Sequence, residues 1–197
     1  MKRACIFLVC VMFSFFIKSQ KLSCYEKCWA IGHPFAAVKV KKISKRCYKI
    51  YNKITTNKQL DTFSNGGTLD AFRHAFFMAA FAQKIKVKKL NKLGIAHEKG
   101  NYKQFLKNEY ENNELPDSIA TVMDLKNNAL GFIIAQKHKT ESLDNLVLIV
   151  ITAIKNGEAV IIKRNKAGNY MDCAGNVVIL TTTKKWATAR CLVSSNN

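Results

Sequence analysis

The chain has 197 residues, 48% of them hydrophobic, and a formal net charge of +19. This length predicts one domain with a sizeable core, and the sequence has no internal repeat, which excludes a repeat protein. The positive charge favours anionic partners: nucleic acid, phospholipid head groups or acidic cell-surface polymers. Lysine supplies most of the charge without interleaved aromatic residues for base stacking. Solubility charge spread over the surface is therefore the alternative interpretation.

The N-terminus has the features of a signal peptide. Met1-Lys2-Arg3 is basic, Ala4–Ile17 is almost entirely apolar, and Ser19 supplies a small residue at an expected cleavage point. We therefore predict a signal peptide over 1–19 and an exported mature chain over 20–197, periplasmic or secreted, without a transmembrane segment. Loss of Lys2, Arg3 and Lys18 lowers the formal charge from +19 to +16. An uncleaved N-terminal anchor is the alternative, although the apolar run is short for a membrane span.

Export makes disulfides the expected state for some cysteines. Of the seven cysteines, Cys5 and Cys10 lie in the signal peptide, so five remain and at least one of these stays free or pairs between chains. Cys173 and Cys191 flank a loop-rich segment and are the expected pair. Structural zinc is not expected, because the spacing lacks paired C-x-x-C units and an oxidising compartment favours disulfides.

The middle of the chain has the hydrophobic periodicity and the cap residues of helices. Gly32 and Pro34 separate the first two helices, Thr68 and Asp117 are expected N-caps, and Gly157 is expected to end the last helix in a left-handed conformation. The expected helices are Tyr25–Ile31, Phe35–Ile54, Thr68–Gln83, Val87–Glu98, Tyr102–Tyr110, one from Asp117 to about Ala135, and one from about Leu143 to Asn156.

The last part of the chain is richer in β-branched residues. A strand is expected over Ala159–Lys163, and turn residues at Asn165–Gly168 allow Asn169–Asp172 to return as its partner, followed by a further extended segment at Val177–Leu180. The predicted fold is therefore mainly α, a compact multi-helix domain with a small C-terminal antiparallel β-hairpin or meander over 158–182.

Three polar motifs interrupt these apolar helices within a motif core over 64–131. Asp70, Arg73 and His74 are spaced i, i+3, i+4, and so share one face of a helix that is otherwise apolar on nearly every side. Such a helix is buried, so its polar groups need partners. The other motifs are His97-Glu98 and the set Asp124, Asn127 and Asn128, which repeats the same spacing and is followed by Gly131. If the motifs converge, they form a polar site in a helical core.

Three interpretations of such a site are open. His74, His97, Glu98 and Asp124 are acceptable ligands for a divalent metal. A metal-free acid–base pair of His74 with His97 or Glu98, with Arg73 holding a phosphate, fits equally well. In both interpretations, four further residues bind the substrate or orient the reacting groups: Asp70, Asp124, Asn127 and Asn128. The third interpretation is a buried network that only fixes the helix packing.

Several specific chemistries are excluded by the residues around these motifs. Glu98 is followed by Lys99, Gly100 and Asn101, so the H-E-x-x-H signature of zinc proteases is absent. The glycines at Gly66 and Gly67 lack the spacing to lysine of a phosphate-binding loop. No nucleophile elbow of a serine hydrolase is present.

The three motifs in this order resemble an uncharacterised bacterial family. The matching stretches are Asn65-Gly66, Asp70 to Ala75 (DAFRHA), Ala96-His97-Glu98 and Met123 to Gly131 (MDLxNNxxG). The family is a domain of unknown function in exported proteins and at the C-terminal ends of wall-associated, toxin-like proteins. The resemblance implies no settled activity, but such terminal domains are often nucleases or lipid hydrolases.

We therefore expect an exported hydrolase that acts on a phosphate-containing substrate, nuclease-like or phospholipase-like. His74, His97, Glu98 and Arg73 are its expected catalytic residues. The alternative is a non-catalytic envelope protein whose polar network is structural and whose basic surface binds anionic polymers or lipids.

Overall fold

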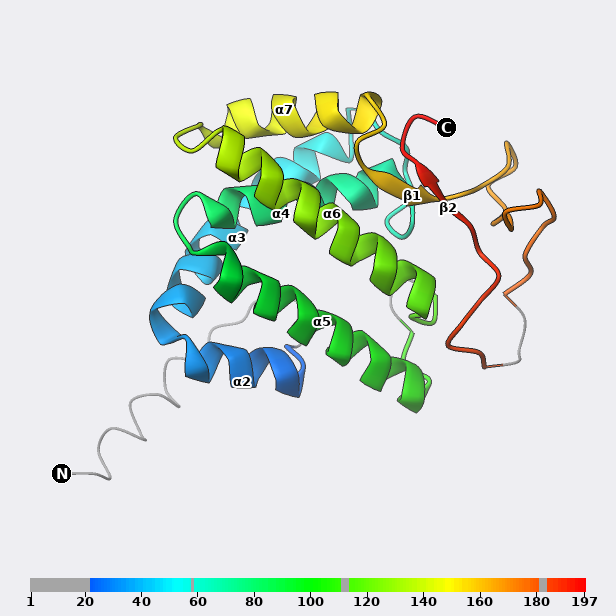
Figure 1. Ribbon diagram of the computed structural model, residues 1–197, viewed down its shortest axis with the longest axis horizontal. Coiled ribbons are helices and arrows are strands. Elements are labelled where there is room, and N and C mark those ends of the chain that lie inside the picture. Colours follow the sequence, from blue (N-terminus) through cyan, green and yellow to red (C-terminus); the bar gives the residue numbers. More distant parts are fainter. Residues whose placement is uncertain (1–21, 58, 111–113, 181–183) are drawn as a thin grey trace.

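A computed structural model describes residues 22–57, 59–110, 114–180 and 184–197. The expected signal peptide and its cleavage point lie outside these residues. The described chain folds into helices with one small sheet near the C-terminus (Figure 1), which confirms the mainly α class. None of the helices in the described ranges combines the length and the hydrophobicity needed to span a bilayer. The elements are α2 Cys24–Gly32, α3 Pro34–Ile54, α4 Thr68–Ala82, α5 Val87–Lys107, α6 Ser118–Lys137, α7 Leu143–Lys155, β1 Val160–Ile162 and β2 Leu192–Ser194.

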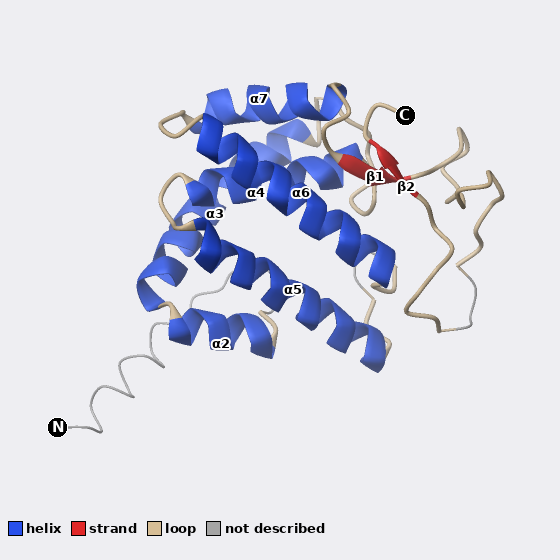
Figure 2. Ribbon diagram, in the orientation of Figure 1, coloured by secondary structure: helices blue, strands red, loops and turns tan. Residues whose placement is uncertain are grey.

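Helix α4 is the centre of the core, as its apolar sequence predicts. It contacts α3, α5, α6 and α7, and its most extensive contact is with α6. Its Phe72 and Phe76 rings stack and are fully buried. Figure 2 shows the small sheet at one edge of the helical body. The polar residues of α4 therefore have to find their partners inside the protein.

The helix ends follow the expected capping chemistry with one correction. The Asp117 side chain accepts a hydrogen bond from the Ala120 N–H at the start of α6, and Gly157 beyond α7 has a φ of +81°, as predicted. Thr68 is not the cap of α4, because it is the first residue of that helix. The Asp61 carboxylate caps α4 instead, because it accepts hydrogen bonds from the N–H groups of Thr68 and Leu69.

Helix α5 is continuous, so the expectation of two helices with a break near Gly100 was wrong. Gly100 lies inside the helix against the turn that begins α2, where a Cβ atom would come within 2.7 Å of Ser23 Cβ. Asn101 is buried and donates a hydrogen bond to Glu98 one turn earlier. The glycine thus serves close packing of α5 on α2 and does not end the helix.

The sheet is antiparallel as expected, but its second strand is different. β1 pairs with β2, with Val160 opposite Ser194, and this partner was not predicted. Asn169–Asp172 does return antiparallel beside the end of the predicted strand, because Met171 N–H donates to the Lys163 carbonyl at 2.9 Å, but it forms isolated bridges, Arg164 with Tyr170 and Met171 with Val177, and not a ladder. The chain therefore makes a long excursion between the two strands before it returns to the helical body.

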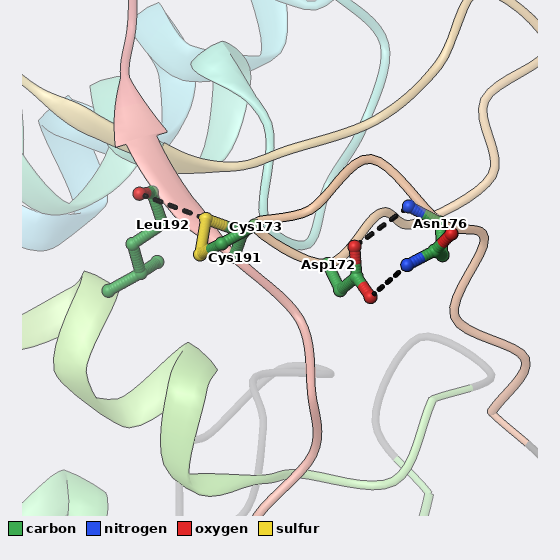
Figure 3. The surroundings of a disulfide bond; sticks show 5 residues. All are labelled: Asp172, Cys173, Asn176, Cys191 and Leu192. Carbon is green, nitrogen blue, oxygen red and sulfur yellow. Dashed lines mark hydrogen bonds between the residues drawn. A yellow bond between two sulfur atoms is a disulfide. The ribbon is translucent and has the colours of Figure 1, made fainter.

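The disulfide between Cys173 and Cys191 ties this excursion to the residue just before β2, which confirms the predicted pair (Figure 3). Cys24 and Cys28 are exposed free thiols, and Cys47 is a buried one. Burial raises the pKa of Cys47 to about 12, so its thiol stays protonated.

Candidate functional site

His74 is the centre of a buried cluster formed by α4 and α6. Its Nε2 atom lies 3.1 Å from an Asp124 carboxylate oxygen on α6 and 3.6 Å from an Asp70 oxygen one turn earlier on α4. All three side chains are buried. One ligand atom from each of these residues lies within 4.8 Å of the other two, so the three can share one cation. The structure thus brings together three of the polar residues that the sequence singles out.

The second ring nitrogen of His74 determines what Nε2 can do. Nδ1 lies 3.2 Å from the Asn128 amide oxygen. With that acceptor opposite it, Nδ1 carries the proton of the neutral ring and Nε2 presents a lone pair. Burial and the Arg73 charge lower the pKa of His74 to about 3, so the ring is neutral at ordinary pH. Nε2 has no hydrogen-bond partner among the described residues.

Arg73 connects this cluster to the surface. Its Nη2 and Nε atoms donate to one Asp70 oxygen, at 2.6 and 3.1 Å. The other Asp70 oxygen accepts the Gly66 N–H at 2.8 Å. The Arg73 side chain is 22% exposed, so a guanidinium anchored on the buried cluster also reaches solvent. This arrangement suits recognition of an anion.

His97 and Glu98 are neighbours in sequence but point to different partners. His97 Nδ1 lies 3.1 Å from a Glu26 carboxylate oxygen on α2. Burial lowers the pKa of His97, but the hydrogen bond to Glu26 and the nearby carboxylate charges outweigh it and raise the pKa above its ordinary value. Glu98 accepts hydrogen bonds from Thr121 and Asn101, and burial raises its pKa. The raised pKa of the half-buried His97 favours its charged form, and the raised pKa of the buried Glu98 favours its neutral form.

A pocket opens beside the cluster and collects several of the predicted residues. The described residues that line it include Asp70, Arg73, His97, Asn101 and Asp124, together with the turn at Asn65-Gly66. His74 is not in the lining and lies behind it, against Asp70 and Asp124. Glu98, Asn127 and Asn128, which the sequence assigns to the same site, are also outside the lining. The pocket lining therefore combines three carboxylates, Asp70, Glu114 and Asp124, with three basic side chains, Arg73, His97 and Arg190.

Asn127 and Asn128 support the site without lining it. The fully buried Asn127 side chain donates to the Val160 carbonyl at 2.9 Å and accepts the Val160 N–H at 3.0 Å. This paired hydrogen bond fastens β1 onto α6. Asn128 instead sets the His74 tautomer, as described above.

Two residues of the pocket lining, Glu114 and Arg190, were missed by the sequence interpretation. Arg190, just before β2, is buried, forms an ion pair with Asp117 and lies 3.6 Å from a Glu114 oxygen. The Tyr170 hydroxyl donates to the same Glu114 carboxylate. Arg164 stacks over the Tyr170 ring. These contacts join residues that are far apart in the sequence, so spacing does not reveal them. The one available signal was the position of Arg190 next to a disulfide cysteine.

A family model described as a domain of unknown function (DUF6973) matches residues 27–158. The match spans most of the chain, and the protein belongs to this family. It covers α4, α5 and α6, and thus the whole Asp70, His74 and Asp124 cluster. Comparison with curated proteins and with solved structures gave no match.

Proposed function

We propose that this protein is an exported hydrolase that acts on a phosphate-containing substrate, and that Asp70, His74 and Asp124 hold a divalent cation for the reaction. The observation that carries the proposal is the buried Nε2 lone pair of His74, which faces two carboxylates at the back of a pocket. The resemblance to exported and wall-associated toxin-like proteins supports export and a hydrolytic role.

A cation resolves an electrostatic problem in the cluster. A neutral imidazole that presents a lone pair to a carboxylate oxygen at 3.1 Å repels it, unless a proton or a metal ion lies between them. One nitrogen and two carboxylate ligands form a donor set that suits zinc or manganese. Asn128 completes the arrangement, because its amide oxygen accepts from the opposite ring nitrogen and so fixes the ring orientation, as acceptors beside metal-bound histidines do.

The remaining polar residues of the pocket suit the substrate. A cation held by Asp70, His74 and Asp124 would supply Lewis-acid chemistry, because it would make a nearby water a better nucleophile toward phosphorus. Arg73 and His97 line the pocket and face the phosphate, and the raised pKa of His97 favours the charged form that would neutralise it. We assign to His97 the proton that the leaving oxygen takes up. The Arg73 guanidinium, held on Asp70 and 22% exposed, would face a phosphate in the pocket.

The alternative, a purely structural network, fits the cluster less well. A structural network satisfies its buried polar atoms, whereas His74 Nε2 has no hydrogen-bond partner among the described residues. The same residues lie beside a pocket rather than in a sealed core. Asn127, by contrast, has both of its amide atoms paired with Val160 and is structural by the same criterion.

Hydrolysis of nucleic acid and of phospholipid vesicles by the purified protein, with manganese, zinc or magnesium, tests the proposal. We expect activity on one of these substrates that is lost on chelation and in His74→Ala and His97→Ala. His138→Ala is the matched control, because this half-buried histidine lies outside the cluster at the end of α6. Circular dichroism must show that each variant retains its helices. Full activity in folded His74→Ala, or no activity with any of these metals, would overturn the proposal.

A further inference from the structure

A line of exposed side chains runs from the end of α2 along one face of α3. Ile31, Phe35 and Val38 are 71%, 86% and 61% exposed. Lys42, Lys45 and Lys49 continue the line, and all three are exposed. Steps of three and four residues place Phe35, Val38 and the three lysines on one face of α3, and Ile31 lies at the end of α2 before the break at His33. We call this line the α3 stripe.

The apolar end of the α3 stripe is not the face by which α3 packs on the core. α3 turns its buried residues Ala36, Cys47 and Ile54 toward the core, so the stripe lies on its outer side. The turn between α2 and α3 lies at the edge of the molecule away from β1 and β2 (Figure 1). Contiguous exposed apolar groups of this size mark an interaction surface more often than single ones do.

The charge of α3 identifies the partner. Every charged residue of this helix is basic. Lys42, Lys45 and Lys49 form no ion pair with a carboxylate in the described part of the chain. A partner for the stripe must therefore receive apolar side chains at one end and offer negative charge along the rest.

We propose that the α3 stripe docks the protein on an anionic phospholipid surface. Ile31, Phe35 and Val38 enter the boundary between head groups and acyl chains, while the lysines contact the lipid phosphates. Nucleic acid satisfies the lysines but offers no apolar medium for Ile31 and Val38, and these aliphatic side chains cannot stack on bases. The α3 stripe shares no residue with the pocket lining, so membrane docking is independent of the proposed hydrolase activity.

Co-sedimentation with phospholipid vesicles tests this surface. The purified protein is mixed with vesicles of phosphatidylcholine alone or with about one third phosphatidylglycerol, at low and high salt. We expect binding to the anionic vesicles only, weakened by salt. The double variant Phe35→Ser/Val38→Ser should bind at least about tenfold less tightly, and each of Lys42→Gln and Lys45→Gln about fivefold less tightly at low salt.

The matched control is Leu148→Ser, which removes a comparably exposed apolar side chain (63%) from α7. It should bind like the unchanged protein. Equal binding to neutral vesicles would overturn the proposal, as would the absence of vesicle binding. Loss of binding on lysine substitution alone, with Phe35→Ser/Val38→Ser unaffected, would also contradict it, because a purely electrostatic face fits nucleic acid instead.

Discussion

Gly131 of α6 lies directly against the backbone of Ala75 on α4. A Cβ atom at position 131 would come within 2.3 Å of the Ala75 carbonyl oxygen and 3.0 Å of the Ala79 nitrogen. The two helices can approach this closely only because residue 131 has no side chain. Since His74 precedes Ala75, this contact also sets the distance from His74 to Asp124 and Asn128. One glycine thus links the packing of the core to the geometry of the site.

Gly131→Ala should therefore damage both stability and the site. The added methyl group meets backbone that has nowhere to move, and we expect a loss of about 3 kcal/mol in the free energy of unfolding. Urea titration followed by circular dichroism measures it. Gly32→Ala is the control, because a Cβ atom there meets nothing within 4 Å. An equal, small effect of both substitutions would contradict the close approach of α4 and α6.

Asn127→Ala should destabilise the fold through the sheet. The substitution removes both hydrogen bonds to the half-buried Val160 and leaves its N–H and carbonyl without the Asn127 amide. We expect a loss of about 2 to 4 kcal/mol, since buried unsatisfied groups are costly. Asn145→Ala, at an exposed position on α7, should change stability by less than about 0.5 kcal/mol. A neutral Asn127→Ala would show that the amide does not fasten β1.

The ion pair between His97 and Glu26 should make stability depend on pH. Burial raises the pKa of Glu26, but its bonds to His97 and Ser23 outweigh burial and lower that pKa below 4.5. The raised pKa of His97 means that its contribution is fully present below 6.5 and is lost as pH rises through the folded-state value. The contribution of Glu26 is present above 4.5 and is lost as pH falls through its own lowered value.

His97→Gln tests this pair. Its deficit in unfolding free energy relative to the unchanged protein should be largest, about 1 kcal/mol, between roughly pH 4.5 and 6.5, and should shrink at higher pH. Denaturant titrations over a pH series measure the difference. A deficit that does not change with pH would mean that His97 is not charged in the folded protein.

The disulfide should stabilise the wall of the pocket. It closes a loop of 18 residues, and loss of the bond should reduce the unfolding free energy by about 3 kcal/mol. Cys191→Ser should also loosen Arg190, the adjacent residue, from Asp117. The exposed free thiol Cys28 provides the control substitution, Cys28→Ser, which should have little effect. Comparable stability of Cys191→Ser and Cys28→Ser would contradict this account.

The sequence predicts what depends on local spacing. The buried helix with Asp70, Arg73 and His74 on one face follows from periodicity, and the cap at Asp117 from turn chemistry. The sequence did not predict the pairing of β1 with β2, because that choice depends on contacts between distant segments. The break expected at Gly100 was wrong because a glycine required for close packing looks the same in sequence as one that ends a helix.

In the candidate site, too, local spacing identifies some residues, and long-range contacts determine the others. Spacing along α4 and α6 identifies Asp70, His74 and Asp124, which meet in the structure. Spacing does not show that the Glu98 side chain contacts Thr121 and not the pocket. Consecutive residues on a helix point in different directions, so His97 lines the pocket while Glu98 does not. Arg190 was missed because its partner Asp117 is far away in sequence and carries an obvious capping role of its own.

Titration of the metal-free protein with Mn²⁺ in a calorimeter tests the central claim most directly. We predict one cation per chain, with affinity at least about tenfold weaker in Asp124→Asn and in His74→Gln, because each variant removes a ligand. Asp144→Asn, an exposed carboxylate on α7, should bind like the unchanged protein. No saturable binding of Mn²⁺, or of Zn²⁺ in the same assay, or equal affinity in all four proteins, would contradict a cation site at Asp70, His74 and Asp124.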